Sequence, residues 1–218
     1  IGDSIRNKFA SPVIGLPQEE PLFNINQYPV KLLEGFMTDT RAIIVVKKAE
    51  ENKFEIRKNQ YASPQNVFHI SGKTATDIID CIEKNAPQMI QIIKESEIAE
   101  SQRINSQSLI NPKVIENKFH ISVQIPSGYA YMLQKSNFLW LKKEIIGGNT
   151  SLLIYQVPLN TIKKEVDLIS GIIKMRDSIG KLYISGKEPE TNMITEEAYA
   201  PYLFKINLDG KETFETKG

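Results

Sequence analysis

The stretch of sequence that decides the fold is Phe119–Pro158, FHISVQIPSGYAYMLQKSNFLWLKKEIIGGNTSLLIYQVP, which holds the densest strand signal and the only tryptophan, Trp140. Apolar residues alternate with polar ones from Phe119 to Ile125, and this period of two predicts a strand with one buried face. The turn residues 126–128 and 147–149 separate further apolar runs that begin at Tyr129, Phe138 and Leu152. The stretch therefore predicts an antiparallel meander.

The first half of the chain predicts four more strands. Residues 42–46 form a continuous apolar run, AIIVV, which is typical of a strand covered on both faces. Residues 54–58 follow a polar turn at 50–52, and we expect them to pair with the first run as the second arm of a hairpin. Short strands are also predicted at 22–25 and 66–71.

The longest predicted element is a helix from Thr74 to about Ile104. Thr74 with Asp77 forms a start that resembles a capping box, in which Asp replaces the usual Glu. One face at helical spacing is apolar: Ile78, Ile79, Ile82, Ala86, Met89, Ile90 and Ile93. Because Pro87 lacks a backbone donor, we expect it to kink or split the helix.

Shorter helices are predicted on either side of these elements. Asp3 can cap a helix that carries Ile5 and Phe9 on one side. Residues 30–37 predict a helix of one to two turns, and the Pro- and Gly-rich residues 11–21 predict a loop. A second clear helix has an apolar face and a glycine near its end: Ile162, Val166, Ile169, Ile173 and Gly180.

The polar tract 101–112 is the predicted domain boundary. We therefore expect an α+β protein of two lobes, an N-terminal lobe at 1–110 and a C-terminal lobe of meander plus helix at 111–218. Each lobe is expected to hold a mostly antiparallel sheet covered by helices.

A hairpin is predicted at 203–214, around the tight-turn dipeptide Asp209-Gly210. An unpaired strand edge invites pairing with another chain. We expect this hairpin either to meet a second molecule at a sheet edge or to cover strands that are absent from the sequence, so that the second lobe is incomplete at its C-terminus.

Composition excludes several classes of protein. With 218 residues, 41% of them hydrophobic, the chain can bury a substantial core. Its 27 Lys and Arg residues balance 26 Asp and Glu residues, and no basic stripe stands out, which argues against nucleic-acid binding. Cys81 is the only cysteine, so an internal disulfide is excluded. No apolar run approaches the ~20 residues of a membrane span.

The sequence offers few reactive groups. The two histidines, His69 and His120, lie in predicted strands with no Cys or second His at ligand spacing. A zinc site would need carboxylates from elsewhere in the chain, so half-exposed strand histidines are the favoured interpretation. Cys81 falls among isoleucines on a helix, which favours a packed core thiol over a reactive one. We assign no catalytic residue, no metal site and no cofactor.

Three other patterns have structural explanations. Residues 147–151, GGNTS, are rich in glycine, but a phosphate loop leads into a helix and this one is flanked by two predicted strands. The acid pairs Glu19-Glu20 and Glu196-Glu197 lie in polar loops, where solvation is usual. Four aromatic residues lie in the predicted strands: Tyr129, Tyr131, Phe138 and Trp140. Core packing is the default interpretation of such residues, and a ligand groove is the alternative.

The chain shares six stretches with a known family: GDSIR at 2–6, LPQEEPLF at 16–23, FHISVQIPSG at 119–128, NFLW at 137–140, MRDS at 175–178 and Thr195-Glu196. They resemble an uncharacterised domain-of-unknown-function family of Bacteroidetes cell-envelope lipoproteins. The resemblance covers most of the chain in the expected order and includes no catalytic motif. It implies an exported protein whose lipidated cysteine lies upstream of Ile1. Members of the family begin earlier than this sequence and continue past Gly218. Residues 119–179 also resemble, more loosely, PsbP-like or Mog-like domains, which are binding or accessory modules.

These observations favour a non-enzymatic envelope lipoprotein that binds an unidentified envelope protein or ligand. We expect contact with the membrane only through the lipid anchor, on the periplasmic side or at the outer membrane. A homo-oligomer that forms through the C-terminal sheet edge is a further possibility. The alternative is an envelope hydrolase, or another enzyme, whose site is assembled from residues distant in sequence. A pocket of ionisable groups with shifted pKa values would favour the enzyme, and an open groove or flat apolar patch would favour binding.

Overall fold

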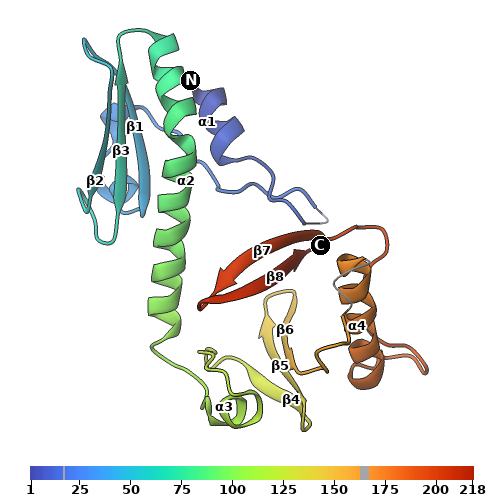
Figure 1. The fold of residues 1–218 in the computed structure, drawn as a ribbon. Helices are drawn as coiled ribbons and strands as arrows, with labels where there is room; N and C mark the ends of the chain where they lie inside the picture. The colour runs from blue at the N-terminus through green and yellow to red at the C-terminus, as the bar shows by residue number, and fades with distance from the viewer. Residues whose placement is uncertain (17, 163–166) are drawn as a thin grey trace. The chain divides into compact units, whose positions relative to one another are not determined.

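The computed structural model describes residues 1–16, 18–162 and 167–218. Within these residues the chain forms helices and three mostly antiparallel sheets (Figure 1), which confirms the predicted α+β class. The chain divides into two compact units. The first comprises Ile1–Val13, Glu20–Leu109 and Gln124–Pro126, and the second comprises Ile14–Glu19, Ile110–Val123 and Ser127–Gly218.

The first unit combines a three-stranded sheet with two α-helices and two 3-10 turns. In chain order its elements are α1 (Gly2–Phe9), η1 (Val30–Leu32), η2 (Gly35–Thr38), β1 (Ala42–Lys48), β2 (Lys53–Lys58), β3 (Asn66–Gly72) and α2 (Ala75–Asn105).

β3 is the central strand of this sheet, because the strand order is β1-β3-β2. β1 runs parallel to β3, and β2 runs antiparallel to it. The predicted hairpin between the first two strands is therefore wrong. Burial explains the order: a central strand loses more contact with water than an edge strand, so the strand whose Val67 and Phe68 are fully buried gains most from that place.

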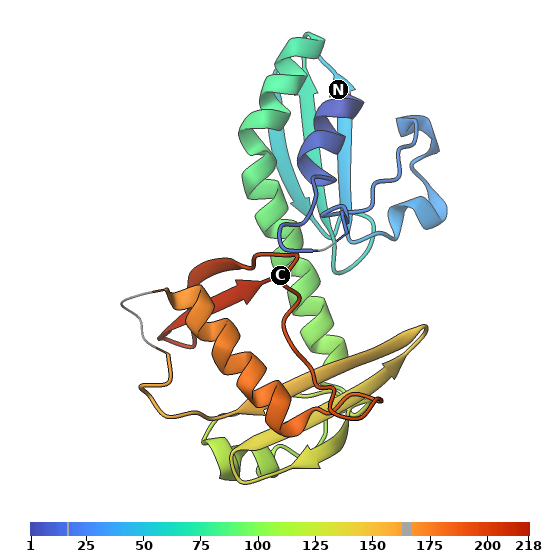
Figure 2. The same cartoon turned by 90° about the vertical axis from the view of Figure 1, so that its right-hand side faces the viewer.

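Both faces of the sheet carry apolar side chains. Figures 1 and 2 show α1 and α2 on one face, where the main core lies: Phe9, Phe68, Ile70, Ile78, Ile82, Ala86, Met89 and Ile93. The opposite face holds a smaller cluster of Ile43, Val45 and Val67, against which Leu33 packs. β1 contributes to both faces, as its continuous apolar run predicts.

α2 begins with the predicted capping box. The amide of Asp77 donates to Thr74 Oγ1 at 3.1 Å, and the amide of Thr74 donates to Asp77 Oδ2 at 2.9 Å. The helix continues through Pro87 as one element of 31 residues, so of the two predicted outcomes, a kink or a split, the split is wrong. Pro87 is exposed, whereas Ala86 and Met89 beside it are buried. The packed face therefore holds the helix together across the missing backbone hydrogen bond.

Three predictions fail in the first 40 residues. Ile1, and not Asp3, is the N-cap residue of α1, and Asp3 lies in the first turn. Residues 22–25 form no strand; an isolated bridge joins Pro12 to Pro21, and proline has no donor to extend a ladder. The expected helix at 30–37 is instead η1 and η2, because Gly35 has a φ of 57°, which a right-handed helix does not allow.

The second unit contains two helices, a three-stranded meander and a hairpin. Its elements are α3 (Lys113–Phe119), β4 (Ala130–Gln134), β5 (Phe138–Ile145), β6 (Gly148–Tyr155), α4 (Leu168–Tyr183), β7 (Tyr202–Leu208) and β8 (Lys211–Lys217). β4, β5 and β6 pair antiparallel in chain order, which confirms the meander from residue 130 onward.

The strand predicted from Phe119 to Ile125 is wrong. Phe119 ends α3, and His120 caps that helix with a left-handed φ of 55°. The residues after it pair with no strand, although Ile125 is 2% exposed and Ile121 is 39% exposed. The apolar side chains of this segment are buried unevenly, and their alternation in sequence does not reveal whether the backbone has a partner.

Trp140 lies in β5 as predicted, but it is only half-buried. Its neighbours across the sheet are Leu133 and Leu153, and its Nε1 donates to Ser151 Oγ at 3.1 Å. Three other apolar residues of β5 are fully buried, Phe138, Leu139 and Leu141, whereas Ile145 at its end is exposed. Trp140 therefore lies at the periphery of the core rather than at its centre.

α4 and the final hairpin complete the second unit. Asp167 caps α4, which carries Ile169, Ile173 and Gly180 of the predicted helix; Ile162 precedes it, and Val166 lies outside the described residues. The ring centroids of Tyr183 and Phe138 lie 4.3 Å apart, so the end of α4 packs on β5. β7 and β8 form the predicted hairpin, with the positive φ at Asp209 and Gly210 that a type I′ turn needs.

Candidate functional site

The face of the first sheet opposite α2 carries a groove of about 350 Å³. Strand register defines which side chains lie on this face, because alternate residues of each strand point the same way. They form three rows across β1, β3 and β2: Ile43, Val67 and Arg57; Val45, His69 and Glu55; Lys47, Ser71 and Lys53. The groove lies over the second and third rows and reaches the turn at 49–51.

The β2 wall of the groove is a row of three charged side chains. Glu55 lies between Lys53 and Arg57: its Oε2 is 2.8 Å from Lys53 Nζ, and its Oε1 is 2.7 Å from Arg57 Nε. Hydrogen bonds from Arg57 and then from Lys53 lower the pKa of Glu55 to about 2. Glu55 is therefore a carboxylate at any physiological pH, with both oxygens engaged.

His69 lies at the centre of the groove floor. Its Nε2 is 2.7 Å from Gln60 Oε1, which holds the ring in place. Burial lowers the pKa of His69, and the positive charge of Arg57 lowers it further. The imidazole is therefore neutral at neutral pH, and its Nδ1 remains a hydrogen-bonding group.

The turn after β1 closes one end of the groove. Ser71 Oγ donates to the carbonyl of Glu51 at 3.1 Å, and the amide of Lys73 donates to Asn52 Oδ1 at 3.0 Å, which fixes the turn against β3. Lys47 and Glu50 also line the groove, and neither forms an ion pair with another described residue. Their charges are available to a ligand.

Gln65 organises the loops at the other end of the sheet. Its side chain is 2% exposed, and its Nε2 donates to the carbonyls of Thr38 and Thr40 at 2.6 and 2.8 Å. Its Oε1 accepts from the amides of Tyr61 at 3.0 Å and Ala62 at 3.4 Å. One buried amide thus joins the segment before β1 to the loop before β3.

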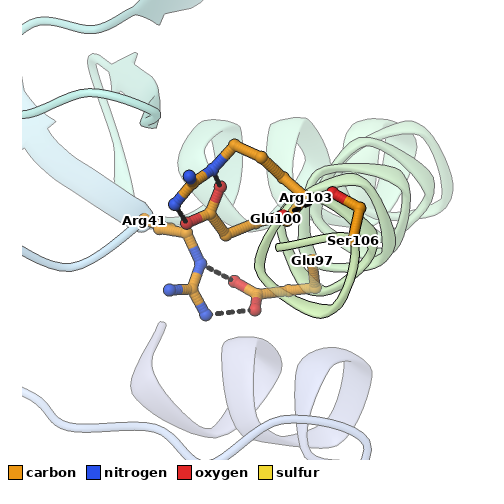
Figure 3. Close-up of polar contacts among 5 residues, drawn as sticks. All are labelled: Arg41, Glu97, Glu100, Arg103 and Ser106. Carbon is orange, nitrogen blue, oxygen red and sulfur yellow. Dashed lines mark hydrogen bonds and ion pairs between the residues drawn. The ribbon is translucent and has the colours of Figure 1, made fainter. Parts of the chain in front are cut away.

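A second polar cluster joins β1 to α2 and is structural (Figure 3). Arg41 Nε donates to Glu97 Oε1 at 2.8 Å, and its Nη2 bonds the other oxygen of the same carboxylate. One turn along α2, Arg103 holds Glu100 through two bonds of 2.8 Å. Each guanidinium pairs with a carboxylate of the cluster, so contacts within the cluster explain these residues without a ligand.

A third cluster fixes the segment after α4. The amide and hydroxyl of Thr195 donate to Asp177 Oδ1 at 2.8 and 2.7 Å, and Arg176 Nη1 donates to Thr195 Oγ1 at 2.6 Å. A Cβ on Gly180 would lie 2.3 Å from the carbonyl oxygen of Met193, so only glycine fits there. The stretches MRDS and Thr195-Glu196 therefore meet in space, and their contacts explain them without a ligand.

The remaining residues weighed from the sequence lie apart. His69 is in the groove, but His120 is exposed at the end of α3. Cys81 is half-buried on α2 and packs against the main core, as expected of a core thiol. The acid pairs are exposed, and residues 147–151 belong to the turn and strand of a hairpin.

The four strand aromatics divide between packing and partial exposure. Phe138 is buried between Tyr155 and Tyr183. The hydroxyl of Tyr131 is buried without a hydrogen-bond partner among the described residues, and burial raises its pKa. Tyr129 lies beside Lys143, whose Nζ is 6.0 Å from the ring centroid. None of the four lines the groove of the first sheet.

Sequence reasoning missed Glu55, Gln60 and Gln65. A signal for Glu55 exists, since charges at 53, 55 and 57 repeat with a period of two and must share one face of a strand. Gln60 and Gln65 lie in a loop whose path depends on contacts with β1 and β3, and nothing local marks them.

No group of three or more His, Cys, Asp or Glu side chains within the described part of the chain could hold a metal ion. No helix among those residues is both long and apolar enough to cross a membrane.

Two family models match the chain. Domain of unknown function (DUF8532) matches residues 1–106, and Domain of unknown function (DUF4837) matches residues 108–218. Neither a search of curated proteins nor a search of solved structures gave a match, so the looser likeness to PsbP-like or Mog-like domains stays a prediction. Because the second model spans more than half of the chain, the protein belongs to the DUF4837 family.

Proposed function

We propose that the protein is a non-enzymatic binding module that recognises its ligand or partner at the groove of the first sheet. The observation that supports this most strongly is the charge state of the groove. Glu55 has a pKa of about 2, and the pKa of His69 is lowered from its ordinary value, so neither group is shifted toward neutral pH. A general acid or base works best with a pKa near the working pH. Groups of fixed charge are instead suited to recognising a ligand through hydrogen bonds and ion pairs.

A hydrolase is the weaker candidate for the same reason. The pKa shifts that could have indicated catalysis move Glu55 and His69 away from neutrality rather than toward it. Glu55 has both oxygens occupied by cations, which lowers its value as a nucleophile or base.

The test compares partners captured by tagged protein in its native envelope. Lys47→Glu and His69→Ala change the groove, and Lys84→Glu, exposed on the outer face of α2, is the matched control. A component that wild type and the control retain, and that both groove variants lose, supports the proposal. Capture that is identical across all four proteins contradicts it.

We further propose that the protein is exported and lipid-anchored in the cell envelope of a Bacteroidetes species, on the strength of the six shared stretches. A labelled fatty acid should then be incorporated into the protein in its native host. Cys81 packs on the core, so Cys81→Ser should retain the label. A protein that stays unlabelled, or that loses its label with Cys81→Ser, would show that no upstream cysteine carries a lipid.

A further inference from the structure

The outer edge of β1 exposes a regular row of backbone groups. The carbonyl of Arg41 accepts from the amide of Asn66, and the amide of Ala49 donates to the carbonyl of Gly72. Odd-numbered residues of β1 therefore point their N–H and C=O groups at β3. Since successive residues of a strand point to opposite sides, Ala42, Ile44, Val46 and Lys48 point theirs outward.

These outward groups have one hydrogen bond in the described part of the chain. Thr40 Oγ1 contacts the carbonyl of Ala42 at 3.4 Å. β1 pairs with β3 and with no other described strand. An added strand can satisfy all the outward N–H and C=O groups of an edge of this length, which isolated contacts cannot do.

The two edges of the sheet differ in how they resist pairing. β2 carries Lys53, Glu55 and Arg57 at alternate positions, which is the usual protection of an edge. β1 has an uncharged run from Ala42 to Val46, and its only charges are Lys47 and Lys48 at the end. Neither lysine forms an ion pair with another described residue.

We propose that β1 binds an extended segment of a partner protein by strand addition, with apolar side chains beside Ile44–Val46 and acidic ones beside Lys47 and Lys48. Opposite charges on neighbouring strands are favourable, so the two lysines select the acidic end. Because Val45 and Lys47 line the groove, alternate side chains of the added strand lie along it. The inference rests on the proposed binding function and names the kind of partner.

The probes are two labelled hexapeptides with blocked ends, Thr-Val-Thr-Val-Glu-Glu and its reverse, which cover parallel and antiparallel addition. Fluorescence anisotropy with the full chain should show one of them binding, and Lys in place of Glu should weaken it. N-methylation of the three amides that face β1 should abolish binding, whereas methylation of the other three should leave it unchanged. Equal effects of the two methylation patterns would overturn strand addition in favour of side-chain binding.

Proline variants test the protein side. Lys48→Pro removes an outward N–H. It should lower the affinity for the peptide roughly threefold to tenfold relative to Lys48→Ala, which is the effect of one hydrogen bond. Edge strands tolerate proline where the N–H faces solvent. Lys58→Pro is the matched control, because the amide of Asn59 bonds Gln65 and the N–H of Lys58 therefore points outward from β2. Equal losses in both proline variants would contradict the β1 edge.

Amide hydrogen exchange separates this inference from the groove. In the free protein, Ile44 and Val46 should exchange faster than Ile43 and Val45, and the peptide should slow the first pair. Slow exchange at Ile44 and Val46 in the free protein, or no binding of either peptide, overturns the edge proposal. The groove is judged independently by the capture of native partners with His69→Ala, because Lys47 belongs to both the groove and the β1 edge.

Discussion

At the scale of single residues, the buried amide of Gln65 carries the clearest energetic consequence. Gln65→Ala would remove the buried donor that the carbonyls of Thr38 and Thr40 share. We expect the free energy of unfolding to fall by about 1–3 kcal/mol, measured by urea denaturation. The exposed Gln88→Ala should change it by less than ~0.5 kcal/mol. Equal effects of the two substitutions would contradict the role of Gln65.

Glu55 gives a prediction about pH. Its folded pKa of about 2 lies below the ordinary carboxyl range, so its ionised form stabilises the fold above that range, and the stabilisation is lost as the pH falls toward 2. Carbon-detected NMR should show the Glu55 carboxyl titrating near that value. Arg57→Ala should raise the pKa of Glu55 most, and Lys53→Ala should raise it less. Lys84→Ala, on the outer face of α2, should leave the titration unchanged.

At the scale of elements, α2 should divide sharply into a core half and an exposed half. Ile82 is 0% exposed in the core of the first unit, whereas Ile98 is 56% exposed. We expect Ile82→Ala to cost about 2–5 kcal/mol, through lost burial and a cavity. Ile98→Ala should cost less than ~0.5 kcal/mol. A cost below half a kcal/mol at Ile82 would show that this face is not core.

Pro87 should weaken the helix that it fails to break. It lies inside α2 with its side chain exposed, so an alanine there would restore a backbone donor without disturbing the core. We expect Pro87→Ala to raise the free energy of unfolding by about 1–3 kcal/mol. Chemical denaturation checks this, and an unchanged or lower stability would mean that the helix relies on a bend at this position.

The elements show what could be predicted from the sequence. Thr74 and Asp77, the α2 face around Ile82, and Asp209-Gly210 depend on residues a few positions apart, and all three were predicted correctly. The β1–β3 pairing depends on which strand loses most water, which no local pattern records. Phe119–Ile125 alternates in sequence like a strand, yet only Ile125 of its apolar residues is buried and the segment pairs with no strand. The groove was missed because Glu55, Gln60 and His69 meet only after β3 has entered between β1 and β2.

At the scale of the whole molecule, two optical probes report different units. Trp140, the only tryptophan, belongs to the second unit, and the 31-residue α2 belongs to the first. We expect Ile82→Ala to lower the unfolding midpoint followed by far-ultraviolet circular dichroism. The midpoint followed by tryptophan fluorescence should stay where it is in the wild type. Equal shifts of both midpoints would show that the chain unfolds as a single cooperative system.

The order β1-β3-β2 also has a consequence for the time course of synthesis. β1 and β2 leave the ribosome first, yet neither pairs with the other, and both await β3. The first sheet can form its one hairpin, β2 with β3, only after β3 has followed, and β1 must then add to β3 in parallel. In the meander, by contrast, every strand pairs with its neighbour in sequence. Contacts that wait for distant residues slow folding, and the run Ala42–Val46 stays unprotected until β3 and α2 have followed. A chaperone that holds nascent apolar segments should meet this protein at that stage of its translation.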